Sequence, residues 1–327
     1  MKKILGIGVI GMGMMGQIHA AEYAANPQCR LQALVDTSPA VLSESCRRYD
    51  VPGYTDHREL LARKDVQAVS ICTPDDQHRQ VVLDALTAGK HVLLEKPIAT
   101  TMEDADAIVA AAAHTPVKLM MGHTLRFSPR YKKAKELIQD GAIGEVQSLF
   151  ARRTNIISVP HRLAGRVSLL AFLGVHDLDI MRWMAESEVV KVYCEVKKGL
   201  LAAQGYDVED VVFTTLRFAS GAIGCGEFGW ILPVNHPSGH DFRLDITGTH
   251  GALTIDEAHD GFSVAGVERY IQPPVQARTA PVVAAFLECI LLDKKPPVTA
   301  EDGREALRIA IAAQKSAAIG LPVDLVR

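Results

Sequence analysis

The 327-residue sequence lacks a long apolar run, a paired cysteine motif and an excess of charge of either sign. No run reaches the roughly 18 apolar residues that a helix needs to span a bilayer. The six cysteines are scattered and form no C-x-x-C pair, which predicts free thiols in a reducing compartment and no metal site. A formal net charge of −3 is too small to predict a nucleic-acid or membrane partner.

The first residues, MKKIL, superficially resemble the start of a signal peptide. The apolar run that follows is broken by Gly6, Gly8 and Gly11, whereas the apolar region of a secretory signal is usually continuous. We therefore expect a mature N-terminus and a cytoplasmic protein.

Strands alternate with helices in the first 122 residues. Short apolar runs predict strands over residues 4–10, 31–35, 66–72, 91–94 and 117–122. The segments between them predict helices over residues 14–25, 39–49, 77–88 and 102–114. This alternation is typical of βαβ units, so residues 1–122 are expected to form one doubly wound α/β domain with a parallel sheet.

The pattern changes in residues 123–327, which we expect to form a second, α+β domain. Helices are predicted over residues 129–139, 173–184, 282–292 and 300–319, and strand-like runs such as 211–218, 222–228 and 242–247 follow one another without helices. Such runs predict a large, mostly antiparallel open sheet. Because an open sheet face commonly needs covering, we expect a homodimer or homotetramer.

A glycine cluster joins the first predicted strand to the first predicted helix. Gly11, Gly13 and Gly16 form a G-x-G-x-x-G motif, and Asp36 ends the next strand about 20 residues further on. This context is typical of a Rossmann dinucleotide site. Gly11 would allow the tight turn, Gly13 the approach of the pyrophosphate to the helix N-terminus, and Gly16 close packing of the helix.

Asp36 predicts the cofactor. A carboxylate here can accept hydrogen bonds from the adenosine ribose hydroxyls and would repel a 2′-phosphate. The next two residues, Thr37 and Ser38, bring no arginine to neutralise that phosphate. NAD is therefore favoured over NADP. Met14 and Met15 would cover apolar faces of the cofactor or pack in the core.

Glu95, Lys96 and Pro97 come directly after the strand predicted at residues 91–94. Ligands of open α/β sheets bind at the carboxyl ends of strands. This location favours a functional role for Lys96 over that of a solvated surface charge.

Taken together, the motifs resemble those of the glucose–fructose oxidoreductase, inositol dehydrogenase and rhizopine-catabolism (Gfo/Idh/MocA) family of NAD(P)-dependent oxidoreductases. The resemblance covers essentially the whole chain. It is carried by the glycine motif with His19, Cys72-Thr73-Pro74 with His78, Glu95-Lys96-Pro97, Arg126-Phe127, the GVHDLD sequence at residues 174–179, and Glu301-Asp302-Gly303.

The resemblance implies roles for several residues. Lys96 would lie near the nicotinamide and hydrogen-bond the reacting oxygen, and His176 would act as general base or orient the substrate. Asp179 is expected to cap a helix or form a salt bridge. The cofactor site is expected to comprise Gly11, Gly13, Met14, Met15, Gly16, Asp36, Thr73, Pro74, His78, Glu95 and Lys96.

One position departs from the family pattern. Many family dehydrogenases carry an aspartate four residues before the histidine, where this chain has Phe172. A phenyl ring can neither accept a proton nor bind a hydroxyl. Either Lys96 and His176 suffice, or another group substitutes; His123 and His161 are candidates for contacts with the substrate.

Arginines are concentrated between residues 151 and 166, where no acid occurs. We expect their charge to be met by water, by another chain or by an anionic substrate, because arginine suits bidentate recognition of carboxylate or phosphate. A solvated loop or an oligomer contact is the alternative. The arginines assigned to substrate binding are Arg126, Arg162 and Arg166.

These observations predict an NAD-dependent oxidoreductase. It would transfer a hydride between nicotinamide and a hydroxyl or carbonyl of a sugar, polyol or sugar-acid substrate. Two alternatives stay open, since a fold alone does not fix function. One is a glycosidase- or lyase-type relative that retains its NAD and uses transient oxidation, and the other is a non-catalytic, ligand-sensing relative.

Overall fold

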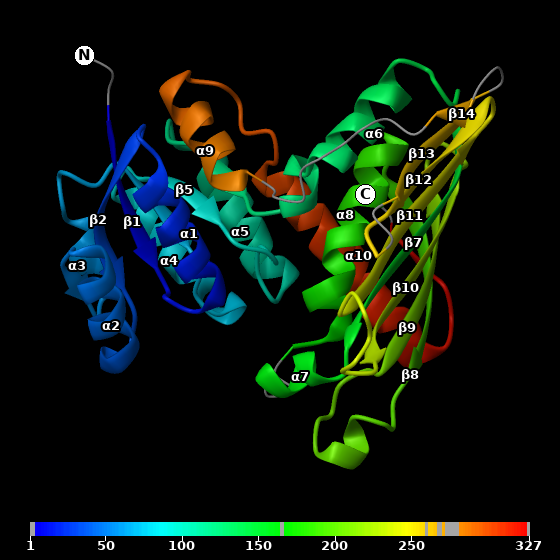
Figure 1. Ribbon diagram of the computed structural model, residues 1–327, viewed down its shortest axis with the longest axis horizontal. Helices are drawn as coiled ribbons and strands as arrows, with labels where there is room; N and C mark the ends of the chain where they lie inside the picture. Colours follow the sequence, from blue (N-terminus) through cyan, green and yellow to red (C-terminus); the bar gives the residue numbers. More distant parts are fainter. Residues whose placement is uncertain (1–3, 164–166, 259–260, 267–269, 272–280, 326–327) are drawn as a thin grey trace. The chain divides into compact units, whose positions relative to one another are not determined.

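The structure, a computed structural model, describes residues 4–163, 167–258, 261–266, 270–271 and 281–325 (Figure 1). The chain divides into two compact units. The first contains residues 1–124 and 281–307, and the second contains residues 125–280 and 308–327. Across the described ranges, no helix has both the length and the apolar character needed to cross a bilayer.

The first unit is built on a parallel sheet, as the sequence predicted. Over the described residues the sheet has six strands in the order β3-β2-β1-β4-β5-β6, and all adjacent pairs are parallel. The strands are β1 (Leu5–Ile10), β2 (Cys29–Val35), β3 (Gly53–Tyr54), β4 (Ala68–Ile71), β5 (His91–Leu94) and β6 (Leu119–Met121). The helices are α1 (Met14–Ala25), α2 (Pro39–Tyr49), α3 (His57–Leu61), α4 (His78–Thr87), α5 (Met102–Ala113) and α9 (Val282–Leu291), with a 3-10 turn, η1, at Asp75–Gln77.

The order of the strands places the ligand edge of this sheet. The strand order reverses direction between β1 and β4, which lie side by side at its centre. Such a switch point opens a crevice at the carboxyl ends of the strands. The glycine turn follows β1 and Thr73 follows β4 at this edge. The short β3 and α3 were not predicted, because two residues are too few to show a strand period.

Residues 281–307 pack with the first unit although they come near the end of the chain. The amide of Met121 donates to the carbonyl of Val298 at 3.0 Å. Gly303 lies so close to Met121 that a Cβ would be 3.0 Å from its side chain. These contacts extend the first unit with α9 and with the start of α10 (Ala300–Ile319). The sequence placed the whole of this segment in the second domain.

The second unit contains the mostly antiparallel open sheet. Its described part has nine strands in the order β14-β13-β12-β11-β7-β10-β9-β8-β15, in which only β7 and β10 pair in parallel. The strands are β7 (Val146–Ile156), β8 (Val189–Lys197), β9 (Val211–Phe218), β10 (Ile223–Leu232), β11 (His240–Gly248), β12 (Gly251–Asp256), β13 (Gly261–Gly266), β14 (Tyr270–Ile271) and β15 (Val323–Asp324).

One face of this sheet is covered by helices (Figure 1). Apolar side chains of α6, α8 and the end of α10 share a core with the strands. The helical segments of this unit are α6 (Pro129–Gln139), α7 (Ser158–Arg162), a π-helical turn η3 (Leu170–Gly174), α8 (Val175–Ala185), η4 (Ala202–Gln204) and the end of α10, with η2 (Thr124–Phe127) at its start. The homodimer or homotetramer expected from the open sheet stays a prediction.

Two adjacent arginines of β7 point to opposite faces of the sheet. Arg153 is buried, and its guanidinium donates to both carboxylate oxygens of Asp177 on α8, at 2.5 and 3.1 Å. Arg152 lies on the other face, where it pairs with Glu227 at 2.7 Å and with Asp241 at 3.4 Å. Alternation along the strand therefore gives one arginine a buried partner and the other partly exposed ones.

Because one ion pair is buried and the other is partly exposed, we expect the same substitution to lower the free energy of unfolding by different amounts. Arg153→Met leaves a carboxylate buried without its partner, so we expect it to lower the free energy of unfolding by about 3–5 kcal/mol. Arg152→Met removes a partly exposed pair and should cost at most about 1 kcal/mol. Urea titration followed by tryptophan fluorescence measures both, because Trp183 and Trp230 lie in this unit. Equal losses of unfolding free energy in the two variants would contradict the conclusion that only Arg153 has a buried partner.

Candidate functional site

The glycine turn after β1 has the geometry that a dinucleotide needs. Gly11 has a φ of +88°, and a Cβ there would lie 2.7 Å from the carbonyl of Cys72. A Cβ on Gly16 would lie 1.8 Å from the carbonyl oxygen of Gly11. Only glycine permits this left-handed turn and this close approach of α1 to the turn. Gly13, in contrast, has open space where a Cβ would stand.

The open space at Gly13 lies at the N-terminus of α1. Gly13 is the N-cap residue, and no side chain caps the helix there. The first amides of a helix carry no intrahelical partner and favour an anion. The turn therefore fits a pyrophosphate. Gly11 makes the tight turn and Gly16 allows α1 to pack closely, as the motif indicated, whereas the role of Gly13 in the approach of the pyrophosphate stays a prediction.

Asp36 is held in place by two backbone amides. Met12 donates to Oδ2 and Ser38 donates to Oδ1, both at 2.8 Å. Each carboxylate oxygen retains acceptor capacity for a ribose hydroxyl. Met14 is 63% exposed beside the turn, a position that suits cover for the cofactor, whereas Met15 is half-buried.

The carboxyl ends of β4 and β5 bring Thr73, Pro74 and the Glu95-Lys96-Pro97 turn to the same sheet edge. His78 at the start of α4 connects the two segments, because its ring nitrogens lie 2.9 Å from the carbonyl of Pro97 and 3.0 Å from that of Thr73. Burial lowers the pKa of His78, and the neutral ring can donate to only one of these carbonyls. His78 thus contacts the backbone of Thr73 and Pro97, and its assignment to cofactor binding stays a prediction.

Glu95 is buried behind Lys96. Its Oε1 lies 3.2 Å from Nε2 of His19, and its Oε2 accepts from the amide of Lys96 at 3.3 Å. Burial alone would lower the pKa of His19, but Cys72 and the Glu95 carboxylate raise it to about 10. The assignment of Glu95 to cofactor binding stays a prediction, and its carboxylate contacts His19 and the amide of Lys96.

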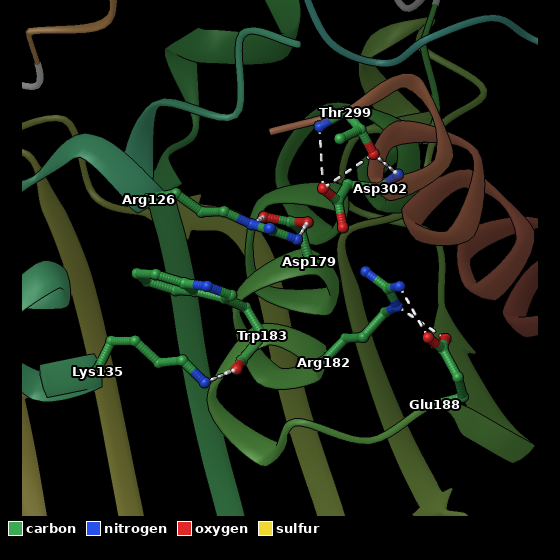
Figure 2. A network of polar contacts seen from close by, with 8 residues as sticks. All are labelled: Arg126, Lys135, Asp179, Arg182, Trp183, Glu188, Thr299 and Asp302. Carbon is green, nitrogen blue, oxygen red and sulfur yellow. Dashed lines mark hydrogen bonds and ion pairs between the residues drawn. The ribbon is translucent and has the colours of Figure 1, made fainter. Parts of the chain in front are cut away.

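His176 stands in the first turn of α8, directly after the π-helical turn. Such turns are rare and occur often at functional sites. The next residue, Asp177, is held by Arg153, and Asp179 accepts two hydrogen bonds from Arg126 at 2.5 and 2.8 Å. Figure 2 shows this fork. The expectation that Asp179 forms a salt bridge is confirmed.

The C-terminal end of α8 is also held by charged side chains (Figure 2). Lys135 donates to the carbonyl of Trp183 at 2.7 Å and to Glu186 at 2.6 Å. Arg182 forms a fork with Glu188 at 2.7 and 2.8 Å. Cations near the last carbonyls complement the helix dipole. Both ends of the helix that carries His176 are therefore fixed.

The residues assigned to substrate binding belong to both units, and each is described by its own surroundings. His123 follows β6 in the first unit and is buried. His161 on α7 is exposed, bonds to Gln204 at 2.9 Å and stacks on Tyr206. Arg126 is buried with its guanidinium against Asp179. The side chain of Arg162 and all of Arg166 lie outside the described residues, so their roles stay predictions.

The charges of the arginines between residues 151 and 166 were expected to be neutralised by water, another chain or an anionic substrate. This prediction was wrong for two of them, which form salt bridges within the chain. Arg152 and Arg153 pair with Glu227, Asp241 and Asp177, which are 24 to 89 residues away in sequence. Strand register and the packing of α8 bring these acidic residues close to the two arginines. The sequence around the arginines gives no indication of these partners.

Phe172 lies in the π-helical turn, one helical turn before His176, and is half-buried. Its ring centroid is 6.0 Å from that of the buried Trp230. Aromatic pairs at this separation stabilise each other beyond their burial. Position 172 is therefore occupied by an apolar side chain that packs against Trp230.

The geometry at Asp36 generates a prediction of cofactor preference. NADH should bind more tightly than NADPH by about tenfold or more, because the carboxylate repels a 2′-phosphate. Asp36→Asn removes the charge but keeps a hydrogen-bond acceptor, so it should bring the affinities for NADH and NADPH closer together. Fluorescence titration with both nucleotides measures it, and equal affinities in the unaltered protein would contradict the role of Asp36.

Comparison with known proteins agrees with a dinucleotide-binding fold. Residues 5–123 match the model of the oxidoreductase family with an NAD-binding Rossmann fold, and residues 131–254 match the GFO/IDH/MocA C-terminal domain. The chain is 29% identical to myo-inositol 2-dehydrogenase of Thermotoga maritima over 95% of each chain. It is also 29% identical to scyllo-inositol 2-dehydrogenase (NAD(+)) of Bacillus subtilis, over 97% of this chain and 95% of that protein.

Solved structures show the same architecture. The crystal structure of scyllo-inositol dehydrogenase from Lactobacillus casei with bound NAD(H) and scyllo-inositol superimposes with a TM-score of 0.85 and 26% identity, covering 98% of this chain and 99% of that one. The two matched domain models, the dinucleotide turn and this likeness lead to one conclusion: the chain belongs to the Gfo/Idh/MocA family of NAD-binding oxidoreductases.

Proposed function

We propose that this protein is an NAD-dependent dehydrogenase that interconverts a CH–OH group and a carbonyl on a polyol, sugar or sugar acid. The observation that carries the proposal is the fully formed cofactor turn with Lys96 at the same edge of the sheet. The similarity to inositol dehydrogenases of Thermotoga maritima and Bacillus subtilis supports a polyhydroxylated substrate. His176 at the start of α8 supplies the second candidate for the chemistry.

Bound NAD would supply the hydride acceptor. Lys96 would donate a hydrogen bond to the reacting oxygen and stabilise the negative charge that develops on it. His176 would take the hydroxyl proton, a task that suits an imidazole near neutral pH. The buried pairs at Asp177 and Asp179 hold the first turn of α8 and so limit how far the His176 ring can move.

Phe172 has no carboxylate that could share the proton or bind a hydroxyl of the substrate. In the proposed mechanism, acid–base catalysis therefore depends on Lys96 and His176. The same departure motivates the two alternatives, an NAD-retaining glycosidase or lyase and a ligand-sensing protein. An NAD-retaining enzyme would turn over substrate without net reduction of NAD, and a sensor would bind without turnover.

A substrate panel tests the proposal directly. Inositols, open-chain polyols, aldoses and sugar acids would be supplied with NAD, and absorbance of the reduced nicotinamide would be followed. We expect NADH to accumulate with at least one of them. Product without NADH would support the NAD-retaining alternative and would contradict a simple dehydrogenase.

Substitution of Lys96 tests the mechanism. Lys96→Met should lower kcat by about a hundredfold or more because a donor to the developing oxyanion is lost, while NADH affinity stays nearly unchanged. Lys64→Met, an exposed lysine of the same unit, is the matched control and should change neither. Near-normal turnover in the Lys96 variant would show that Lys96 has no part in the chemistry.

A further inference from the structure

A buried polar cluster lies beneath the cofactor turn, and the mechanism above makes no use of it. Its members come from α1 and from the ends of β4 and β5, and all are nearly or fully inaccessible to solvent. They are His19, Tyr23, Ser70 and Glu95. Polar groups are costly to bury, so a cluster placed directly behind Lys96 calls for an explanation.

The contacts within the cluster form one continuous chain. Nε2 of His19 lies 3.2 Å from Oε1 of Glu95. Its other ring nitrogen, Nδ1, lies 3.1 Å from the hydroxyl of Ser70, which is 2.8 Å from the hydroxyl of Tyr23. Nδ1 is therefore within hydrogen-bond distance of Ser70, whereas Nε2 and Oε1 are in ion-pair contact without the geometry of a hydrogen bond.

The separation of 3.2 Å places His19 and Glu95 as an ion pair when the imidazole is protonated. Burial lowers the pKa of His19, whereas Cys72 and then Glu95 raise it, and an imidazolium would balance a carboxylate that is otherwise buried alone. Cys72 also contacts this imidazole, with its Sγ 3.5 Å from Nδ1. Burial raises the pKa of Cys72, and the contact with His19 lowers it, so the thiol and the carboxylate both interact with the same imidazole.

The other oxygen of Glu95 connects the cluster to the site, because Oε2 accepts the amide hydrogen of Lys96 at 3.3 Å. Gly122, directly after β6, leaves room for the carboxylate, since a Cβ there would come within 2.9 Å of Oε1. On the other side of Lys96, the carbonyl of Pro97 meets the ring of His78 at 2.9 Å. The backbone around Lys96 is thus held from both sides.

We infer that His19 and Glu95 are positioning residues: the buried pair fixes the backbone of Lys96, so that its ammonium meets the reacting oxygen in the correct place. The inference rests on the proposed function, in which Lys96 acts on the substrate. It gives a task to two residues of the sequence motifs, His19 after the glycines and Glu95 before Lys96, to which the mechanism assigns no step. Neither side chain needs to touch cofactor or substrate.

The test uses His19→Gln, Glu95→Gln and the double variant. Each single change should lower kcat by about ten- to a hundredfold, because a small misplacement of a catalytic group has effects of this size. NADH affinity should stay within about threefold of the original. The double variant should lose less than the product of the single losses, since two amides can hydrogen-bond without leaving a charge buried.

A second readout is independent of activity. Hydrogen exchange of the Lys96 amide should be faster in both single variants, because its acceptor is no longer held. Residue-resolved exchange followed by NMR suits the measurement, since it reports the Lys96 amide separately from that of Ile98. If the unaltered protein turned over no substrate of the panel, the proposed function would fail, and the exchange measurement would still decide whether the pair holds Lys96.

Controls separate positioning from general stability. His57→Gln makes the same change in the same unit at a histidine that pairs with Asp84 at 2.8 Å, and it should alter neither kcat nor exchange at Lys96. Glu95→Asp keeps the charge beside His19 but is too short to reach both partners, so it carries the test if His19→Gln does not fold. Unchanged kcat and unchanged Lys96 exchange in the folded Glu95 variants, or additive losses in the double variant, would overturn the inference.

Discussion

A charge buried in a protein must have a partner, and this constraint organises the regions that carry the residues assigned to chemistry. Asp177 and Asp179 lie one and three residues after His176, and each is paired with a buried arginine. Glu95 precedes Lys96 and is paired with an imidazole. Breaking such a pair is far more costly than replacing it whole. The pairs therefore restrict where Lys96 and His176 can move, whether or not they add net stability.

Much of the cofactor site could be predicted from sequence because its determinants are local. Gly11, Gly13 and Gly16 act through the absence of a side chain within one turn, and Asp36 follows at the end of the next strand. Strand-like runs that alternate with helices predicted the parallel sheet, and strand-like runs that follow one another predicted the open antiparallel sheet. In each case residues close in sequence determine the local structure, so the sequence pattern predicts it.

The arrangement of the charges could not be predicted in the same way. The partners of Arg152 and Arg153 lie on other strands and on α8, and the register that selects them depends on how the sheet pairs. The parallel pairing of β7 with β10 and the π-helical turn before His176 have no local signal. Phe172 could be recognised as a departure from the family pattern, but its support by Trp230 depends on packing.

In the proposed reaction, hydride leaves a substrate carbon and arrives on NAD bound at the glycine turn. The most direct test supplies the best substrate of the panel with deuterium on the reacting carbon and analyses the nicotinamide by mass spectrometry. We expect NADH that carries one deuterium, and none when Lys96 is replaced by methionine in a single-turnover experiment of matched duration. Substrate consumption with unlabelled, unreduced NAD would contradict it.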